Sequence, residues 1–176
     1  MGLYGEVTAG TVKWLGTEFW EGQTRKLGRY QVFHLYRTIH TFLASFPTKI
    51  GGEQLLLHGA DEGNIQSILE NDLSLNGETV HGKVFGRGLY FTNNLEYACK
   101  FSTDNPTKKT VLICRVHVGN VVLGNNKMVI LPKMKDNPKR AYDTSVNNVN
   151  NPTIFVKYKN HTYDIIGVLT IPVRSN

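Results

Sequence analysis

The order of predicted elements along this 176-residue chain predicts an α+β fold with a largely antiparallel sheet. One helical pattern comes first, short strands and helices alternate after it, and the last third is mostly strands. Hydrophobic residues make up 40% of the sequence and charged residues 19%, which is ordinary for a globular protein. The length suits one core, so we expect residues 1–176 to form a single domain.

The first part of the chain predicts an extension followed by a helix. Residues 1–28 are too apolar for a disordered tail, so we expect short strands or turns packed on the body; their large side chains are Trp14, Phe19 and Trp20. Residues 29–46 carry apolar residues at helical spacing, and Pro47 would end that helix.

The middle of the chain predicts alternating short elements. EQLLLHGAD, residues 53–61, indicates a buried strand that ends at His58-Gly59. Residues 61–70 place Ile65, Ile68 and Leu69 on one helical face. Residues 71–89 lack periodicity and predict a long loop. A second helix over 95–102 would be capped by Asn93 or Asn94.

The last third predicts strands around one long loop. Residues 132–152 are rich in proline, lysine and asparagine, which predicts a surface loop. The predicted strands are 110–118, 121–123, 128–131, 153–158 and 164–171.

The net charge limits the kinds of partner, and the cysteine spacing bears on metal binding and redox compartment. The net charge of +6 and the pI near 9.3 suit an acidic protein, a polyanionic small ligand or nucleic acid. The basic residues are scattered and do not alternate with aromatic residues, so nucleic-acid binding is permitted but not indicated. Cys99 and Cys114 form no metal-binding spacing, which predicts two buried or half-buried thiols in a reducing compartment.

No segment predicts membrane insertion or secretion. No apolar run approaches the roughly 20 residues of a membrane helix. The first residues also lack the pattern of a signal peptide. We therefore expect an intracellular protein, in the cytoplasm or nucleus, with a monomer as the default state.

The stretch FGRGLYFTNN, residues 85–94, raises the question of a phosphate-binding loop. The dinucleotide fingerprint needs a third glycine and a helix directly after the loop. Here Gly86 and Gly88 lead instead into the strand-like run Leu-Tyr-Phe. A turn that enters a strand, with Tyr90 or Phe91 in the core, is the structural alternative.

Several ordered motifs together resemble the catalytic domain of the poly(ADP-ribose)-polymerase-like ADP-ribosyltransferases, the diphtheria-toxin-like branch. The resemblance extends over about residues 53–171. Its motifs are the stretches LLLHGA, FGRGLYFTNNLEYACKF, VLICRVHVGNVVLG and YDTSVNNVNNPTIFVKY. It implies two packed, mostly antiparallel sheets with short flanking helices. It also implies NAD as co-substrate, no metal, and a protein acceptor that includes the chain itself.

The resemblance assigns roles to matching residues. His58 would hydrogen-bond the adenosine ribose of NAD, and the backbone of Gly59 would hold the nicotinamide carboxamide. Tyr90 and Phe101 would stack on the two faces of the nicotinamide ring. The glycines before Tyr90 would let the loop fold closely over the ligand. The structural alternatives are a core histidine, a core tyrosine and a turn glycine.

Four positions depart from the family pattern, and one of them, Arg87 in place of the usual lysine, carries no inference. Ile154 stands where polymer-forming members have glutamate, so the chain resembles the His-Tyr-Ile class, which transfers a single ADP-ribose. Ala98 stands where a serine would bind the carboxamide, and Ala60 removes another contact; Ser102 could compensate only if its helix were shifted. Because of these losses, an inactive module that binds NAD or ADP-ribose is an alternative function. Because of the positive net charge, ADP-ribosylation of nucleic-acid ends is a third alternative. An acceptor-recognition loop is expected at 102–109 or 132–150.

Overall fold

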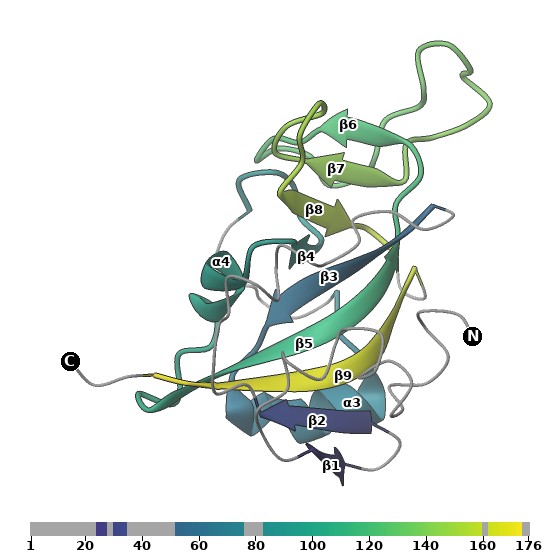
Figure 1. The fold of residues 1–176 in the computed structure, drawn as a ribbon. Helices are drawn as coiled ribbons and strands as arrows, with labels where there is room; N and C mark the ends of the chain where they lie inside the picture. The colour runs from purple at the N-terminus through teal and green to yellow at the C-terminus, as the bar shows by residue number, and fades with distance from the viewer. Residues whose placement is uncertain (1–23, 28–29, 35–51, 76–82, 160–161, 174–176) are drawn as a thin grey trace.

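The computed structural model describes residues 24–27, 30–34, 52–75, 83–159 and 162–173. Its centre is a nine-stranded sheet in the order β1-β2-β9-β5-β3-β4-β8-β7-β6 (Figure 1). The long strands β5 and β9 run through the body, and β6, β7 and β8 lie at one end. The strands are β1 Thr24–Leu27, β2 Tyr30–His34, β3 Glu53–Gly59, β4 Leu89–Thr92, β5 Lys108–His117, β6 Val121–Leu123, β7 Thr144–Val146, β8 Ile154–Lys157 and β9 Tyr163–Pro172.

The pairing of these strands confirms the predicted α+β class with a largely antiparallel sheet. Six of the eight strand pairings are antiparallel, and only β2–β9 and β6–β7 are parallel. The two expected sheets appear as two halves of one hydrogen-bonded sheet. They join through a single residue pair, Leu57 of β3 with Thr92 of β4.

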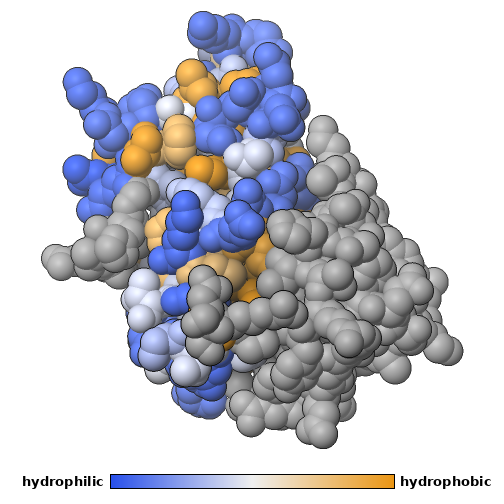
Figure 2. Space-filling model, turned by 60° about the vertical axis from the view of Figure 1, so that its left-hand side comes forward, coloured by the Kyte–Doolittle hydropathy of each residue, from blue (hydrophilic) through white to orange (hydrophobic). Residues whose placement is uncertain are grey.

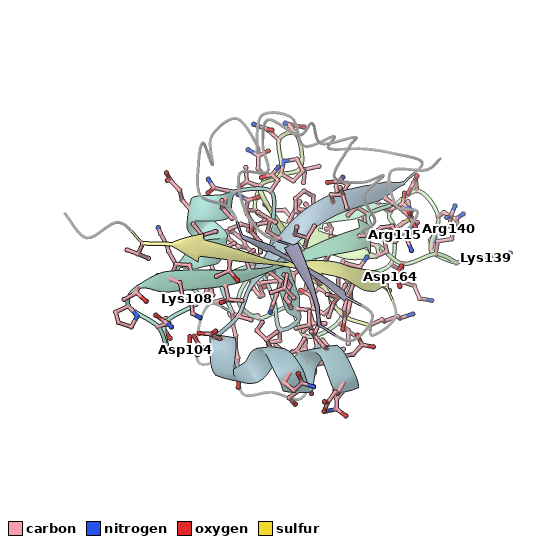
Figure 3. All side chains as sticks on the ribbon, turned by 60° about the horizontal axis from the view of Figure 1, so that its bottom comes forward. Asp104, Lys108, Arg115, Lys139, Arg140 and Asp164 are labelled. Atoms are coloured by element: carbon pink, nitrogen blue, oxygen red, sulfur yellow. The ribbon has the colours of Figure 1, made fainter. Side chains whose placement is uncertain are left out.

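The short helices form where the sequence predicts them. A 3-10 turn, Glu62–Asn64, leads into α3, Ile65–Asn71, which buries Ile65 and Leu69. Helix α4, Leu95–Cys99, begins at Asn94, whose side-chain oxygen accepts from the Tyr97 backbone N–H at 2.9 Å. Figure 3 shows α3 lying across one face of the central strands.

The core explains the apolar run in β3. Leu55, Leu56 and Leu57 are all almost fully buried, so both faces of this strand are covered. A strand covered on both faces needs a continuous apolar run and not an alternating one. Leu56 packs in the main cluster with α3, β5, Phe91 and Phe155.

The predicted helix over 29–46 is wrong where the structure describes it. Residues Tyr30–His34 form β2, which pairs in parallel with β9. Helical spacing of apolar residues is a local signal, and long-range strand pairing overrides it. The rest of that prediction, and the expected packing of residues 1–23, lie outside the described residues.

Two predictions in the last third are also wrong. Residues 128–131 form no strand, and the segment after them contains only an isolated bridge between Lys133 and Ala141. The predicted loop at 132–152 contains the fully buried strand β7, between β6 and β8. Three residues are too few for a periodic pattern, so the neighbouring strands decide this element.

A buried lysine connects three segments beside β8. Lys157 Nζ donates to the His117 carbonyl at 2.7 Å, to Thr144 Oγ1 at 2.9 Å and to Asp143 Oδ1 at 3.2 Å. Asp143 also accepts from the backbone N–H groups of Gly119 and Asn120. Burial lowers the pKa of Lys157, and the Asp143 carboxylate opposes that shift. The aspartate of the Tyr-Asp-Thr motif therefore has a structural role here.

We expect Asp143→Asn to lower the free energy of unfolding by roughly 2–3 kcal/mol, because it leaves the buried Lys157 ammonium without its counter-charge. The Asp143 side chain is 29% exposed, which puts the expected loss below the roughly 3–5 kcal/mol for breaking a fully buried pair. Urea unfolding followed by circular dichroism measures the change.

Asp164→Asn is the matched control. It removes a surface partner of Arg115, the pair labelled in Figure 3, and should cost less than about 1 kcal/mol. Equal losses for the two variants would contradict a structural role specific to the buried pair.

Candidate active site

A cavity of about 280 Å³ lies where β3 and β4 part after their single residue pair. Its walls come from β3, the start of α3, β4, α4 and the turn after α4. Five of the predicted site residues line it together: His58, Gly59, Tyr90, Ala98 and Phe101. Within the described residues, the structure thus brings these sequence-distant residues to one pocket. Their roles toward a ligand stay predictions.

His58 bridges the two halves of the sheet beside the junction. Its Nδ1 lies 2.7 Å from the Tyr90 carbonyl oxygen. A carbonyl only accepts, so Nδ1 carries the proton and donates. Burial lowers the pKa of His58 below its ordinary value of 6.5, although the bond to Tyr90 acts in the opposite direction. The imidazole is therefore neutral at physiological pH, and Nε2 is an acceptor with no partner among the described residues.

Tyr90 is held by its own loop. Its hydroxyl donates to the Gly86 carbonyl at 2.8 Å and accepts from the Phe85 backbone N–H at 3.0 Å. Burial raises the pKa of Tyr90 to about 12. The phenol therefore stays protonated and cannot act as a general base near neutral pH. Tyr90 therefore contributes an aromatic ring in a fixed position to the pocket wall.

The two glycines before Tyr90 are required by packing on β8 and on the residue directly after it, Tyr158. Gly86 has a φ of +126°, and a Cβ there would lie 1.6 Å from the Tyr158 hydroxyl. A Cβ on Gly88 would lie 2.3 Å from the Lys157 carbonyl oxygen. The expectation that both glycines serve close approach to a ligand is therefore incomplete: the protein itself occupies that space. Gly88 also lines the pocket.

Gly59 allows β3 to pack directly on α4. A Cβ on Gly59 would lie 1.9 Å from the Ala98 carbonyl oxygen and 3.0 Å from Phe101 Cβ. Ala98 itself is almost fully buried. Both residues are thus fixed by backbone packing, independently of any ligand.

An aromatic pair forms the α4 side of the pocket. Tyr97 and Phe101 contact edge to face, with ring centroids 5.2 Å apart and an interplanar angle of 64°. The sequence motifs predict Phe101 as a pocket residue but not Tyr97. Their spacing of four residues, which places side chains on one helix face, was the available signal.

A carboxylate clamp fixes the turn that carries Phe101. Asp61 Oδ1 accepts from the Thr103 hydroxyl and the Asp104 backbone N–H, each at 3.1 Å. In return, Asp104 Oδ2 accepts from the Gly63 N–H at 2.8 Å. Asp61 also lines the pocket and was missed at the sequence level.

Ser102 does not compensate for Ala98. Its hydroxyl accepts from the Thr110 backbone N–H at 2.8 Å, and the residue is almost fully buried. It is not among the residues that line the pocket. Ala60 does line the pocket and adds only a methyl group.

Ile154 opens β8, as the sequence predicts, but it does not line the pocket. It pairs with Thr92, its side chain is 7% exposed, and its N–H donates to Asn147 Oδ1 at 3.0 Å. The two cysteines agree with their prediction, since Cys99 is half-buried, Cys114 is buried and both are free. Burial raises the pKa of Cys99 to about 11, so the thiol at the end of α4 stays protonated near neutral pH.

A comparison with known families agrees with this arrangement. The family model described as the poly(ADP-ribose) polymerase catalytic domain matches residues 21–165. The chain belongs to this family. The fold, with its mixed sheet and few helices, is that of an ADP-ribosyltransferase domain.

Similar proteins within the family are named protein mono-ADP-ribosyltransferases. Human PARP12 is 28% identical over 141 residues, which are 78% of this chain and 20% of that protein. Human PARP14 is 30% identical over 110 residues, 60% of this chain and 6% of that protein. Mouse PARP11 is 27% identical over 126 residues, 60% of this chain and 38% of that protein. The chain thus spans about a fifth of PARP12 and less than half of PARP11.

The substitution Gly59→Ala tests the close contact between β3 and α4. We expect it to lower the free energy of unfolding by roughly 1–3 kcal/mol, because the Ala98 carbonyl must move. Gly63→Ala is the control, since a Cβ there meets only Asp104 Oδ2 at 3.7 Å, and its effect should stay within about 0.5 kcal/mol. Thermal or urea unfolding compares the two, and a stable Gly59→Ala protein would contradict the contact.

The neutral state of His58 predicts a pH dependence of stability. Below 6.5 the unfolded chain protonates this histidine while the folded chain does not, so the unfolded state binds more protons. The contribution of His58 to the free energy of unfolding is complete above pH 6.5. It falls by about 1.4 kcal/mol per pH unit as the pH drops from 6.5 toward the lowered pKa of His58 in the folded protein.

Urea unfolding between pH 5 and pH 8 tests this by comparing the wild type with His58→Gln. The variant should lack this part of the slope, whatever its absolute stability. Identical slopes would show that His58 titrates normally in the folded protein.

Proposed function

We propose that this chain transfers a single ADP-ribose from NAD to an acceptor on a protein, including itself, and releases nicotinamide. The observation that supports this best is one pocket, in a member of this family, that combines the His58 imidazole, the Gly59 backbone, the Tyr90 ring and the Tyr97–Phe101 pair. Its volume is at the lower end for ligand sites, which suits one nucleoside half of a dinucleotide.

The residues fit NAD by their hydrogen-bonding chemistry. His58 Nε2 is an acceptor, and a ribose hydroxyl is the donor that matches it. Tyr90 and Phe101 would hold the flat, cationic nicotinamide ring, to which aromatic faces are attracted. Gly59 would hold the carboxamide with its backbone.

The reaction requires little chemistry from the protein. The bond between the nicotinamide nitrogen and C1′ of its ribose breaks, and its electron pair leaves with neutral nicotinamide. A bond forms between C1′ and an acceptor oxygen, which loses a proton if it is a hydroxyl and none if it is a carboxylate. Protonated Tyr90 and neutral His58 provide positioning and polarity, the main terms in such a reaction.

Ile154 supports transfer of one unit only. A growing chain needs a ribose hydroxyl as nucleophile, which gains much from a general base. The aliphatic side chain that opens β8 cannot act as one. An ionised carboxylate needs no base, so acidic acceptor residues fit this site best.

A second candidate is a module that binds NAD or ADP-ribose without turnover. Ala98 lacks the hydroxyl expected at the carboxamide, and the Ser102 hydroxyl accepts a hydrogen bond from the Thr110 backbone N–H. One missing hydrogen bond costs about 0.5–1.5 kcal/mol, or up to about tenfold in affinity. Modification of nucleic-acid ends is a third candidate, favoured only by the net charge of +6.

Incubation with isotope-labelled NAD followed by intact mass measurement tests the proposal. We expect mass increments of single ADP-ribose units in the wild type and at least about tenfold less label in His58→Gln, which lacks the imidazole acceptor. Val173→Ser, an exposed position at the end of β9, should label as the wild type does.

The other outcomes separate the candidates. A ladder of increments on one side chain would contradict the assignment of Ile154. No label, together with thermal stabilisation by NAD or ADP-ribose, would support the binding module instead.

A further inference from the structure

A second cavity, of about 400 Å³, lies beside β7 and β8, and it shares no lining residue with the first. Its apolar side is the segment Val129, Ile130 and Leu131, which we call the apolar ridge. Ile130 is 79% exposed and Val129 is 57% exposed. Figure 2 shows apolar side chains interrupting the hydrophilic surface at this end of the molecule. Consecutive aliphatic side chains this exposed indicate a contact surface.

The ridge belongs to a loop whose shape is fixed by its own backbone. Tyr142 N–H donates to the Pro132 carbonyl at 3.1 Å, and Met134 N–H donates to the Arg140 carbonyl at 2.8 Å. At its base, Arg87 N–H donates to the Met128 carbonyl at 2.8 Å. A partner would therefore meet a surface that is already formed, which lowers the entropic cost of binding.

Positively charged residues flank the ridge in the sequence. Residues 127–140 contain five cations and one acid, Asp136. Among the described residues, none of these cations forms an ion pair; they are Lys127, Lys133, Lys135, Lys139 and Arg140. Figure 3 shows Lys139 and Arg140 projecting away from the body. Lys159 adds a further cation to the cavity wall. The surface therefore attracts acidic partners.

The cavity is adjacent to the first pocket through one residue. Tyr158, in the cavity wall, donates its hydroxyl proton to the Phe85 carbonyl at 3.3 Å. The backbone N–H of Phe85 in turn donates to the hydroxyl of Tyr90, which lines the first pocket. A chain segment held on the ridge would lie next to the place where ADP-ribose is transferred.

We propose that the apolar ridge and its cavity are the docking site for an acidic protein segment that carries aliphatic side chains, and that proteins with such segments are the acceptors. This inference rests on the proposed transfer activity. A protein segment is favoured over nucleic acid, because aliphatic side chains in the partner would cover Val129 and Ile130, whereas phosphates would contact only the lysines. The exposed ridge residues are aliphatic and provide no surface for base stacking, and the two tyrosines of the cavity wall, Tyr142 and Tyr158, are only partly exposed.

Fluorescence polarisation without NAD tests the docking. The probes are three labelled peptides: one of alternating glutamate and leucine, one with serine in place of leucine, and one with lysine in place of glutamate. We expect the glutamate–leucine peptide to bind at least about tenfold more tightly than the other two. Added salt should weaken its binding.

Two variants and a control locate the binding surface. Ile130→Ser should weaken the glutamate–leucine peptide by about tenfold, and Lys133→Glu combined with Lys135→Glu should weaken it by at least as much. Val173→Ser replaces an exposed valine at the end of β9 and should leave binding unchanged. Equal affinities for the three peptides, or equal effects of Ile130→Ser and Val173→Ser, would overturn the proposal. So would a single-stranded oligonucleotide that binds more tightly than the peptide in the same assay.

Labelled NAD then tests the acceptor step. The glutamate–leucine peptide should be labelled faster than the serine peptide by the wild type and by Val173→Ser, but not by Ile130→Ser. Docking without preferential labelling would overturn the acceptor assignment. Because docking is measured without NAD, the absence of all ADP-ribose transfer would reject the proposed function, whereas the peptide affinities would still test the docking site.

Discussion

The bond between the His58 imidazole and the Tyr90 carbonyl is the contact on which the pocket depends. The two halves of the sheet meet through one residue pair, Leu57 with Thr92, and then separate. The imidazole crosses the opening directly beside that pair. Because the bond uses the protonated nitrogen, it also decides that the other nitrogen is an acceptor. One interaction thus sets the position, the tautomer and the hydrogen-bonding character of the main polar group in the pocket.

The glycines around the pocket serve packing and access together. Gly59 lets β3 touch α4, and Gly86 and Gly88 let their loop touch β8. Each of these contacts also sets the position of a pocket residue, Phe101 in the first case and Tyr90 in the second. A side chain at Gly59 or Gly88 would displace backbone, and one at Gly86 would displace the Tyr158 hydroxyl and require an unfavourable positive φ. Each glycine therefore has a structural role as well as a place beside the pocket. If a variant at one of these glycines loses activity, its stability must also be measured, because the substitution disturbs packing as well as the pocket.

The described pocket is lined mainly by apolar and aromatic residues, and among them no side chain is an activated nucleophile. Tyr90 is a protonated phenol, His58 is neutral, and the nearby Cys99 thiol stays protonated because burial raises its pKa. The Asp61 carboxylate is occupied by the turn that it clamps. A site of this kind suits a reaction whose electrophile comes from the substrate, as NAD does in this family. The buried Lys157–Asp143 pair lies apart from the pocket, where it ties β5, β7 and β8 together.

The sequence by itself determined the order of the motifs, the strand that ends in His58-Gly59, the helix capped by Asn94 and the strand that carries Tyr90. These features have local signals: a continuous apolar run, a capping residue, and glycines before aromatic residues. Tertiary structure alone decided that residues 30–34 are a strand beside β9, that Thr144–Val146 is a buried strand, and that Tyr97 and Asp61 belong to the pocket. The physical reason is the same throughout. Strand pairing and pocket walls join residues far apart in the chain, and the free energy of those contacts exceeds the local preferences that a sequence pattern records.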